Sequence, residues 1–267
     1  MIMVDWRLIK DGQLNGKCNM AVDHALLIAC DELSTQPTLR LYGWNQPTIT
    51  VGHSQNIEHD IDLGRAQKMG VEIVRRPTGG RALWHGSEVT YSVVAPLGTP
   101  GLGHHLKDIF ESISRYLISG LVRLGVPETI LEFQTGGNRS RGPERSSACF
   151  AELHFGEITA GGKKLIGSAQ RRTQHAFLQH GSILIGEDFD RFTRVCRYEN
   201  KEKRRQACQR LRKTSTNLQQ VLQAPVNFEA VVPSLLEGFR DEANIQLQPE
   251  KLTSKECALR DAILRGS

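Results

Sequence analysis

Two arginines, a threonine, two glycines and a histidine gather in the stretch 75–85, which reads RRPTGGRALWH. Glycines let a backbone turn sharply and approach a ligand closely, and arginines beside them can bind a carboxylate, a phosphate or an acidic protein. A tight hairpin with a basic rim would produce the same pattern, and a pair of glycines alone favours that simpler interpretation. The stretch is a candidate binding loop whose chemistry depends on the rest of the chain.

Further stretches carry a potential nucleophile and potential proton-transfer groups. Residues 145–150 read RSSACF, and residues 163–169 and 179–182 read KKLIGSA and QHGS. A thiol becomes a reactive nucleophile when a nearby cation stabilises its thiolate, and Cys149 follows a polar loop at 134–147 that carries several arginines. A surface loop of that length is often functional.

The other cysteines give no sign of a metal site. They are Cys18, Cys30, Cys196, Cys208 and Cys257. No Cys-x-x-Cys pair occurs, and no cysteine clusters with histidines at zinc-finger spacing. No metal is therefore expected, and in a cytosolic location the thiols would stay reduced. Asp23 and His24 are interpreted as polar positions near a helix face, because nothing completes a ligand set around them.

Apolar segments between these stretches predict the elements that position them. Short β-branched or alternating runs predict strands at 6–9, 38–42, 48–51, 71–74, 89–95, 155–159, 164–166 and 176–185. Apolar periodicity predicts helices at 19–33 and 106–124, and a shorter one is expected at 62–69. The first strand is expected at a sheet edge. The pattern indicates an α+β fold of mixed β-sheets flanked by helices, in one domain over 1–267 whose part from about residue 188 is helical and basic.

The net charge of +5 is mild and by itself does not indicate nucleic acid. The basic residues are unevenly placed, since residues 191–213 contain ten Lys or Arg and two Glu. That segment could be a solvated helical face, or it could receive an acidic partner. No apolar run approaches the ~20 residues that span a bilayer, and the N-terminus lacks the layout of a secretory signal. We expect a cytoplasmic protein that binds neither nucleic acid nor a membrane.

Together these stretches resemble the signature of the lipoate ligase and octanoyltransferase family. The 75–85 stretch matches the glycine loop that wraps the medium-chain acyl group in that family, and residues 163–169 with 179–182 form a second matching block. Residues 145–150 resemble the branch that transfers octanoate through a cysteine, the cysteine-dependent bacterial octanoyltransferases. The resemblance runs over residues 4–190, is weaker beyond, and implies a catalytic domain like that of biotin and lipoate protein ligases.

The resemblance implies an acyltransferase of lipoate biosynthesis. It would move octanoyl from acyl carrier protein to the acceptor lysine of a lipoyl-domain protein, such as the glycine cleavage H protein or the E2 subunit of a 2-oxoacid dehydrogenase. Cys149 would carry the acyl group as a thioester and Lys164 would complete the catalytic dyad, and no cofactor is implied. The substrate-binding residues would be Arg75, Arg76, Thr78, Gly79, Gly80, His85, Gly167, Ser168, Ala169, His180 and Gly181. Residues flanking the site would be Tyr42, Trp44 and His53. From the residues alone, Lys164 is interpreted as a solvent-facing hairpin lysine, like Lys163.

Other activities fit parts of the same pattern. An ATP-dependent lipoate ligase would share the 75–85 loop, but Cys149 would have no role in its adenylate chemistry, and the chain is short of the extra C-terminal domain of many single-chain ligases. An octanoyl amidotransferase between lipoyl-domain proteins would also use a cysteine, although the basic segment at 191–213 favours an acyl carrier donor through steering of an acidic partner. A scaffold that only binds lipoyl domains is disfavoured by the intact Cys149, Lys164 and glycine loop, and a biotin ligase is more distant.

Overall fold

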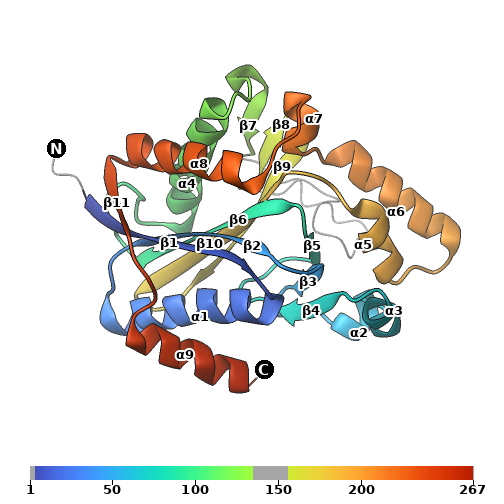
Figure 1. Cartoon of the computed structure of the whole chain (residues 1–267), viewed down its shortest axis with the longest axis horizontal. Helices are drawn as coiled ribbons and strands as arrows, with labels where there is room; N and C mark the ends of the chain where they lie inside the picture. The colour runs from blue at the N-terminus through green and yellow to red at the C-terminus, as the bar shows by residue number, and fades with distance from the viewer. Residues whose placement is uncertain (1–3, 135–155, 267) are drawn as a thin grey trace.

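A large mixed β-sheet forms the centre of the molecule (Figure 1). The computed structural model describes residues 4–134 and 156–266, so Cys149 and most of the loop predicted at 134–147 lie outside the described residues. Within the described part, eight strands form this sheet in the order β11-β1-β2-β6-β10-β9-β8-β7. They are β1 (Val4–Leu14), β2 (Thr38–Trp44), β6 (Glu88–Pro96), β7 (Leu131–Phe133), β8 (Ile158–Ala160), β9 (Lys163–Arg172), β10 (Ala176–Leu184) and β11 (Ile245–Pro249).

A smaller sheet carries the candidate binding loop. Its described strands are β3 (Thr48–Val51), β4 (Glu72–Arg75) and β5 (Leu83–His85), in the order β4-β3-β5. Strand β3 pairs in parallel with β4 and antiparallel with β5. The loop that joins β4 to β5 therefore crosses the end of β3. The interpretation of this stretch as a tight hairpin is wrong, because a hairpin would pair β4 with β5 directly.

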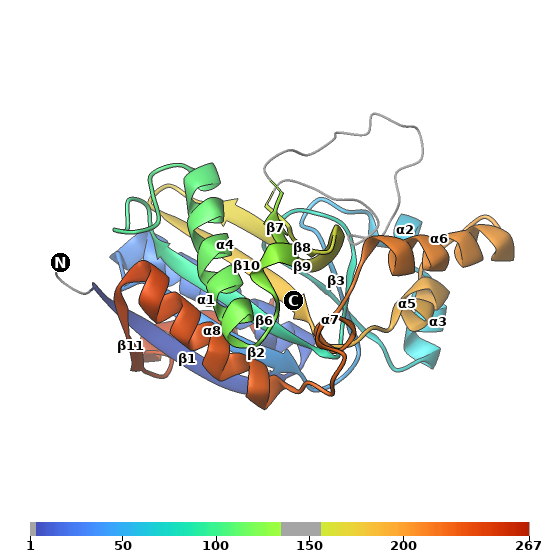
Figure 2. The same ribbon diagram turned by 90° about the horizontal axis from the view of Figure 1, so that it is seen from above.

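Helices cover both faces of the large sheet (Figures 1 and 2). On one face, α4 (Leu106–Arg123) and α8 (Phe228–Ala243) enclose the main hydrophobic core against the strands. On the other face, α1 (Gly16–Leu33) packs on the sheet and α9 (Ser254–Arg265) packs on α1. The remaining described helices are α2 (Ile57–Asp60), α3 (Leu63–Lys68), the short 3-10 helix η1 (Glu128–Ile130), α5 (Phe189–Val195), α6 (Lys201–Thr214) and α7 (Leu218–Leu222).

Local signals explain where the long helices begin. The Asn15 side chain accepts the backbone N–H of Cys18 at 2.8 Å and caps α1. This cap starts the helix three residues before the apolar periodicity at 19–33 begins. At α4, His105 and Asp108 form a capping box. The helices predicted at 19–33 and 106–124 are thereby confirmed.

Two predictions about strands have different outcomes. The strands expected at 155–159 and 164–166 pair antiparallel as β8 and β9, and the two glycines between them, Gly161 and Gly162, adopt positive φ angles of 56° and 73° in a hairpin turn. The prediction that the first strand lies at a sheet edge is wrong, because β11 pairs in parallel with β1 on its outer side. The chain after residue 188 is thus mostly helical but also supplies this strand. The mixed sheets and flanking helices confirm the α+β class.

In the part of the chain that the structure describes, no helix has both the length and the apolar character needed to cross a membrane.

Candidate active site

A cavity of about 480 Å³ opens where the candidate loop meets the large sheet. Residues from both sheets, the loop, α1 and α4 line it. They are Met20, Tyr42, Trp44, Thr50, Arg76, Gly79, Gly80, Arg81, Leu83, His85, Thr90, Phe110, Glu157, Gly167, Ser168, Ala169, Gln170, His180, Gly181 and Ser182. Most of the predicted substrate-binding residues are therefore brought together around one space. A cavity of this size with scattered polar groups suits a small organic ligand.

The glycine loop is held from inside by Arg76. Its guanidinium donates to the carbonyl of Gly79 at 2.7 and 3.0 Å, to that of Arg81 at 2.8 Å and to that of Thr50 at 3.2 Å. Gly80 has a φ of 96°, a left-handed conformation that favours glycine. Arg76 therefore shapes the wall of the cavity, because these donors tie the backbone of the loop to that of β3.

Arg75 is not brought to the cavity. Its side chain is exposed and donates to the carbonyls of Gly52, His53 and Gln55 at 2.7–3.0 Å. These bonds tie β4 to the segment that follows β3. The His53 side chain is also exposed and is not among the residues that line the cavity. Neither Arg75 nor His53 therefore lines the cavity.

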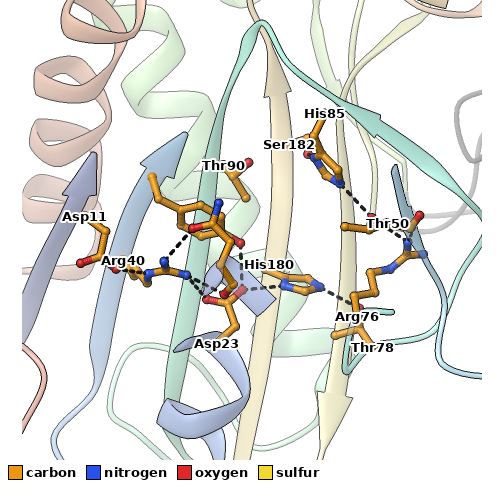
Figure 3. A network of polar contacts seen from close by, with 12 residues as sticks. Asp11, Asp23, Arg40, Thr50, Arg76, Thr78, His85, Thr90, His180 and Ser182 are labelled. Carbon is orange, nitrogen blue, oxygen red and sulfur yellow. Dashed lines mark hydrogen bonds and ion pairs between the residues drawn. The ribbon is translucent and has the colours of Figure 1, made fainter. Parts of the chain in front are cut away.

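A buried carboxylate, Asp23, anchors one wall. It accepts hydrogen bonds from Arg40 at 2.7 Å, from the Tyr42 hydroxyl at 2.9 Å and from His180 Nδ1 at 2.9 Å (Figure 3). Burial opposes ionisation of Asp23, but the Arg40 charge and the His180 hydrogen bond hold its pKa below the ordinary value. Because an ionised carboxylate only accepts, Nδ1 of His180 carries a proton. Its Nε2 then faces the Thr78 hydroxyl at 2.7 Å, so Thr78 lies behind the wall and supports it.

A second buried carboxylate, Glu88, holds the other cavity histidine, His85. Glu88 accepts from His85 Nδ1 at 2.8 Å, from the Ser182 hydroxyl at 2.7 Å and from Trp44 Nε1 at 3.1 Å. Burial opposes its ionisation, but His85 and neighbouring hydroxyls hold the Glu88 pKa below its ordinary value. The Trp44 ring stacks on the His85 ring with centroids 3.9 Å apart. These contacts fix the orientation of the imidazole and indole groups that face the cavity.

Lys164 lies inside the protein. Its side chain has no exposed surface, and its ammonium group forms an ion pair with Glu157, which lines the cavity. Lys163, one residue earlier in β9, is exposed, as expected from the alternation of side chains along a strand. The interpretation of Lys164 as a solvent-facing lysine is therefore wrong, whereas the same interpretation of Lys163 is confirmed. A buried ammonium needs such a partner, since an unpaired buried charge is very costly.

Strands β9 and β10 complete the wall with closely packed small residues. A Cβ at Gly181 would lie 2.6 Å from both the carbonyl oxygen of Gly167 and the hydroxyl of Ser168. The Ser168 hydroxyl is 2.6 Å from the Tyr91 hydroxyl, and burial raises the pKa of Tyr91 to about 12. Ala169 and His180 occupy paired positions beside them. This part of the cavity wall is thus too closely packed to admit a side chain at Gly181.

Four charged residues that build the site were not predicted as site residues. They are Asp23, Arg40, Glu88 and Glu157, each at most 4% exposed. Arg40 sits in a strand in which every residue is buried. A charged residue at a position whose neighbours are apolar needs a buried partner, and this signal could have identified Arg40. Among the described residues, no group of three or more His, Cys, Asp or Glu is arranged to hold a metal ion.

Comparison with known proteins places the chain in one family. Residues 15–240 match the model of the lipoyl protein ligase A/B catalytic domain. The chain is 37% identical over 254 residues to octanoyltransferase LipM of Kyrpidia tusciae, covering 95% of this chain and 93% of the relative. It is 33% identical over 263 residues to octanoyltransferase LipM of Geobacillus kaustophilus, covering 98% and 94%.

Solved structures agree at the level of the fold. A bi-partite lipoate protein ligase from Thermoplasma acidophilum superposes with a TM-score of 0.81 at 21% identity, covering 98% of this chain and 92% of that chain. Lipoate-protein ligase A bound with ATP gives a TM-score of 0.76 at 22% identity, covering 99% and 95%. The predicted ligase-like catalytic fold is thereby confirmed. The chain belongs to the lipoyl protein ligase A/B family and, within it, to the octanoyltransferases, which are acyltransferases.

Proposed function

We propose that this octanoyltransferase moves octanoyl from acyl carrier protein to the acceptor lysine of a lipoyl-domain protein, through a thioester on Cys149. The observation that carries the proposal is the buried Lys164–Glu157 pair at the wall of the cavity. A buried cation beside an acyl-sized cavity suits a thiolate mechanism, because a nearby positive charge stabilises the thiolate. Acceptors of this class include the glycine cleavage H protein and 2-oxoacid dehydrogenase E2 subunits. The similar Thermoplasma ligase is described together with its E2 lipoyl domain.

The first half-reaction loads the enzyme. The Cys149 thiolate attacks the thioester carbonyl of the octanoyl carrier, and the bond between that carbonyl and the pantetheine sulfur breaks. The departing thiolate takes up the proton that Cys149 released. Backbone N–H groups at Gly79–Gly80 or at Gly167–Ser168 would stabilise the oxyanion of the tetrahedral intermediate. His85 and His180, held by Glu88 and Asp23, would form part of the cavity wall around the acyl chain.

The second half-reaction transfers the acyl group. The neutral amine of the acceptor lysine attacks the octanoyl–Cys149 carbonyl, an amide forms, and the bond to the Cys149 sulfur breaks. The proton that the nitrogen loses passes by way of Lys164 to the Cys149 thiolate. Glu157 holds the Lys164 ammonium group in place between turnovers through their buried ion pair. The acyl group stays in a thioester until the amide forms, so the transfer does not require ATP.

The alternatives differ from this route in the role of Cys149 and in the donor. An ATP-dependent ligase would give Cys149 no role. An amidotransferase between lipoyl-domain proteins would use the same dyad with a different donor, so only donor choice separates it from our proposal. A cytoplasmic location belongs to the proposal, since a reactive thiol persists where thiols stay reduced.

The test is to incubate the pure protein with octanoyl–acyl carrier protein and an apo lipoyl domain, with and without ATP and magnesium, and to weigh the acceptor by mass spectrometry. We expect one octanoyl addition without ATP, and none with Cys149→Ala. A second arm replaces the donor with an octanoylated lipoyl-domain protein. Labelling that occurs only with free lipoate, ATP and magnesium would favour the ligase, and labelling only in the second arm would favour the amidotransferase.

A further inference from the structure

The positive charge of the chain is concentrated on α5, α6 and the residues between them. Residues 189–214 hold ten of the 34 Lys and Arg residues and three of the 29 Asp and Glu residues. The remainder of the chain therefore has 24 cations and 26 anions, a slight excess of negative charge. We call residues 189–214 the basic arm. A field of one sign on one part of a surface steers partners of the opposite sign.

Helix α6 contributes little to the core. Leu211 is the single buried residue among its fourteen, and seven of the fourteen are Lys or Arg. The helix extends along the edge of the molecule, at the right of Figures 1 and 2. Most helices in proteins are stabilised by burial of an apolar face, and α6 has very little of one. Its exposed face is therefore available for contact with another protein.

A basic recess lies where α6 begins. It has a volume of about 520 Å³ and is lined by Arg65, Arg194, Lys201 and Arg204, with Glu199 as the acidic member of the lining. Asp190 neutralises part of this charge, at 2.6 Å from Arg194 and 3.5 Å from Arg204, and Asp62 lies 3.2 Å from Arg65. The recess keeps an excess of donors, which suits the carboxylates of an acidic protein.

The segment that follows the basic arm pairs with β9, the strand that carries Lys164. After α6 ends, Ser215 forms a β-bridge with Lys164, and the backbone N–H of Thr216 donates to the Lys164 carbonyl at 2.9 Å. No residue of α6 is among the described residues that line the cavity. A protein bound to α6 would thus sit beside the cavity rather than over it. It could deliver an acyl group only on a long, flexible arm.

We propose that the basic arm docks the octanoyl donor, an acidic carrier protein whose acyl group hangs on a phosphopantetheine arm. This inference rests on the proposed function and adds where the donor binds. The acceptor is a poorer fit, because a lysine side chain is much shorter than a phosphopantetheine arm and its domain must sit over the cavity itself. Charge complementarity would act mainly on the rate of encounter with the donor.

The test separates docking from chemistry by measuring Cys149 loading with two donors. The variant Lys201→Glu/Arg210→Glu/Lys213→Glu reverses three exposed cations of α6. We expect its kcat/KM for octanoyl–acyl carrier protein to fall at least about tenfold, with a weaker dependence on salt. Loading from octanoyl-pantetheine, which lacks the protein, should stay within about twofold. The matched control Lys10→Glu/Lys251→Glu/Arg265→Glu changes the net charge equally at exposed positions away from α6 and should load normally from both donors.

Three outcomes would overturn the inference. Carrier loading could be unchanged, both donors could be slowed equally, or only the transfer from preloaded enzyme to the lipoyl domain could be slowed, which would make the basic arm an acceptor surface. Failure of the proposed function is distinguishable from these. In that case the wild-type protein would load from neither thioester, whatever the state of α6.

Discussion

Replacing Asp23 with asparagine should destabilise the protein strongly, because it removes the charge from the centre of a buried network. Asp23 and its partner Arg40 both have no exposed side-chain surface, and they are 2.7 Å apart. Removing one partner of a buried ion pair typically costs 3–5 kcal/mol, since the other charge stays buried. Asp11 still contacts Arg40 at 2.6 Å. We therefore expect a loss near the lower end, about 3 kcal/mol, which lowers Tm by roughly 6–12 °C in a chain of this size.

The loss should depend on pH with a definite sign. The pKa of Asp23 in the folded protein lies below its ordinary value of 3.8, so its charge stabilises the fold above that value. This stabilisation disappears as the pH falls through the lowered folded pKa. The Tm difference between wild type and Asp23→Asn should thus be full at pH 7 and shrink in the most acidic range that the protein tolerates.

Thermal melts followed by circular dichroism across this pH range provide the assay. The control is Asp5→Asn, which changes the same charge at an exposed position and should leave Tm within about 1 °C, since exposed substitutions rarely exceed ±0.5 kcal/mol. An Asp23→Asn protein with a wild-type Tm at pH 7 would refute this reasoning. So would a Tm difference that stays constant as the carboxyl protonates.

Three further predictions concern the glycine loop, the buried ion pair and a buried thiol. Gly80→Ala should lose far more turnover and thermal stability than Gly79→Ala. Gly80 has a φ of 96° and a Cβ there would lie 2.7 Å from the Arg76 guanidinium, whereas a Cβ at Gly79 meets nothing within 4 Å. Equal losses of the two variants in activity assays and thermal melts would contradict this. Glu157→Gln should slow steady-state turnover by about 100-fold or more, because the amide cannot neutralise the Lys164 charge. Glu157→Asp, which keeps the carboxylate, should be partly active. Wild-type turnover in Glu157→Gln would show that the ion pair is dispensable. Burial raises the pKa of Cys30 to about 11, so peptide mapping should find this thiol unalkylated by iodoacetamide at about pH 8 in the folded protein and alkylated in urea; rapid native alkylation would contradict its burial.

Much of the fold could be predicted because its signals are local. The apolar spacing in α4 and the glycine pair before β9 each specify an element within a short window. The position of β1 was not predictable in this way. Its outer neighbour, β11, lies more than 230 residues later in the chain, and its five residues carry no pattern strong enough to stand out among polar helices.

Residues of the site that line the cavity could be predicted from the sequence, whereas the buried charged residues that hold them in place could not. The glycine loop and the two histidines are contiguous motifs, so their types and spacing are visible in the sequence. Asp23 and Glu88 act through partners on other elements, and only the packing of α1 on β10 of the large sheet brings Asp23 within 2.9 Å of His180. The burial of Lys164 likewise depends on the segment after α6, which covers β9.

The most direct test of the mechanism is to find the acyl group on the enzyme. Mixing the protein with octanoyl–acyl carrier protein, with no acceptor and no ATP, should add one octanoyl mass. Peptide mapping should place it on Cys149, and hydroxylamine should remove it, as expected of a thioester. An adduct on another cysteine, or wild-type turnover in Cys149→Ala, would contradict the proposed thioester route.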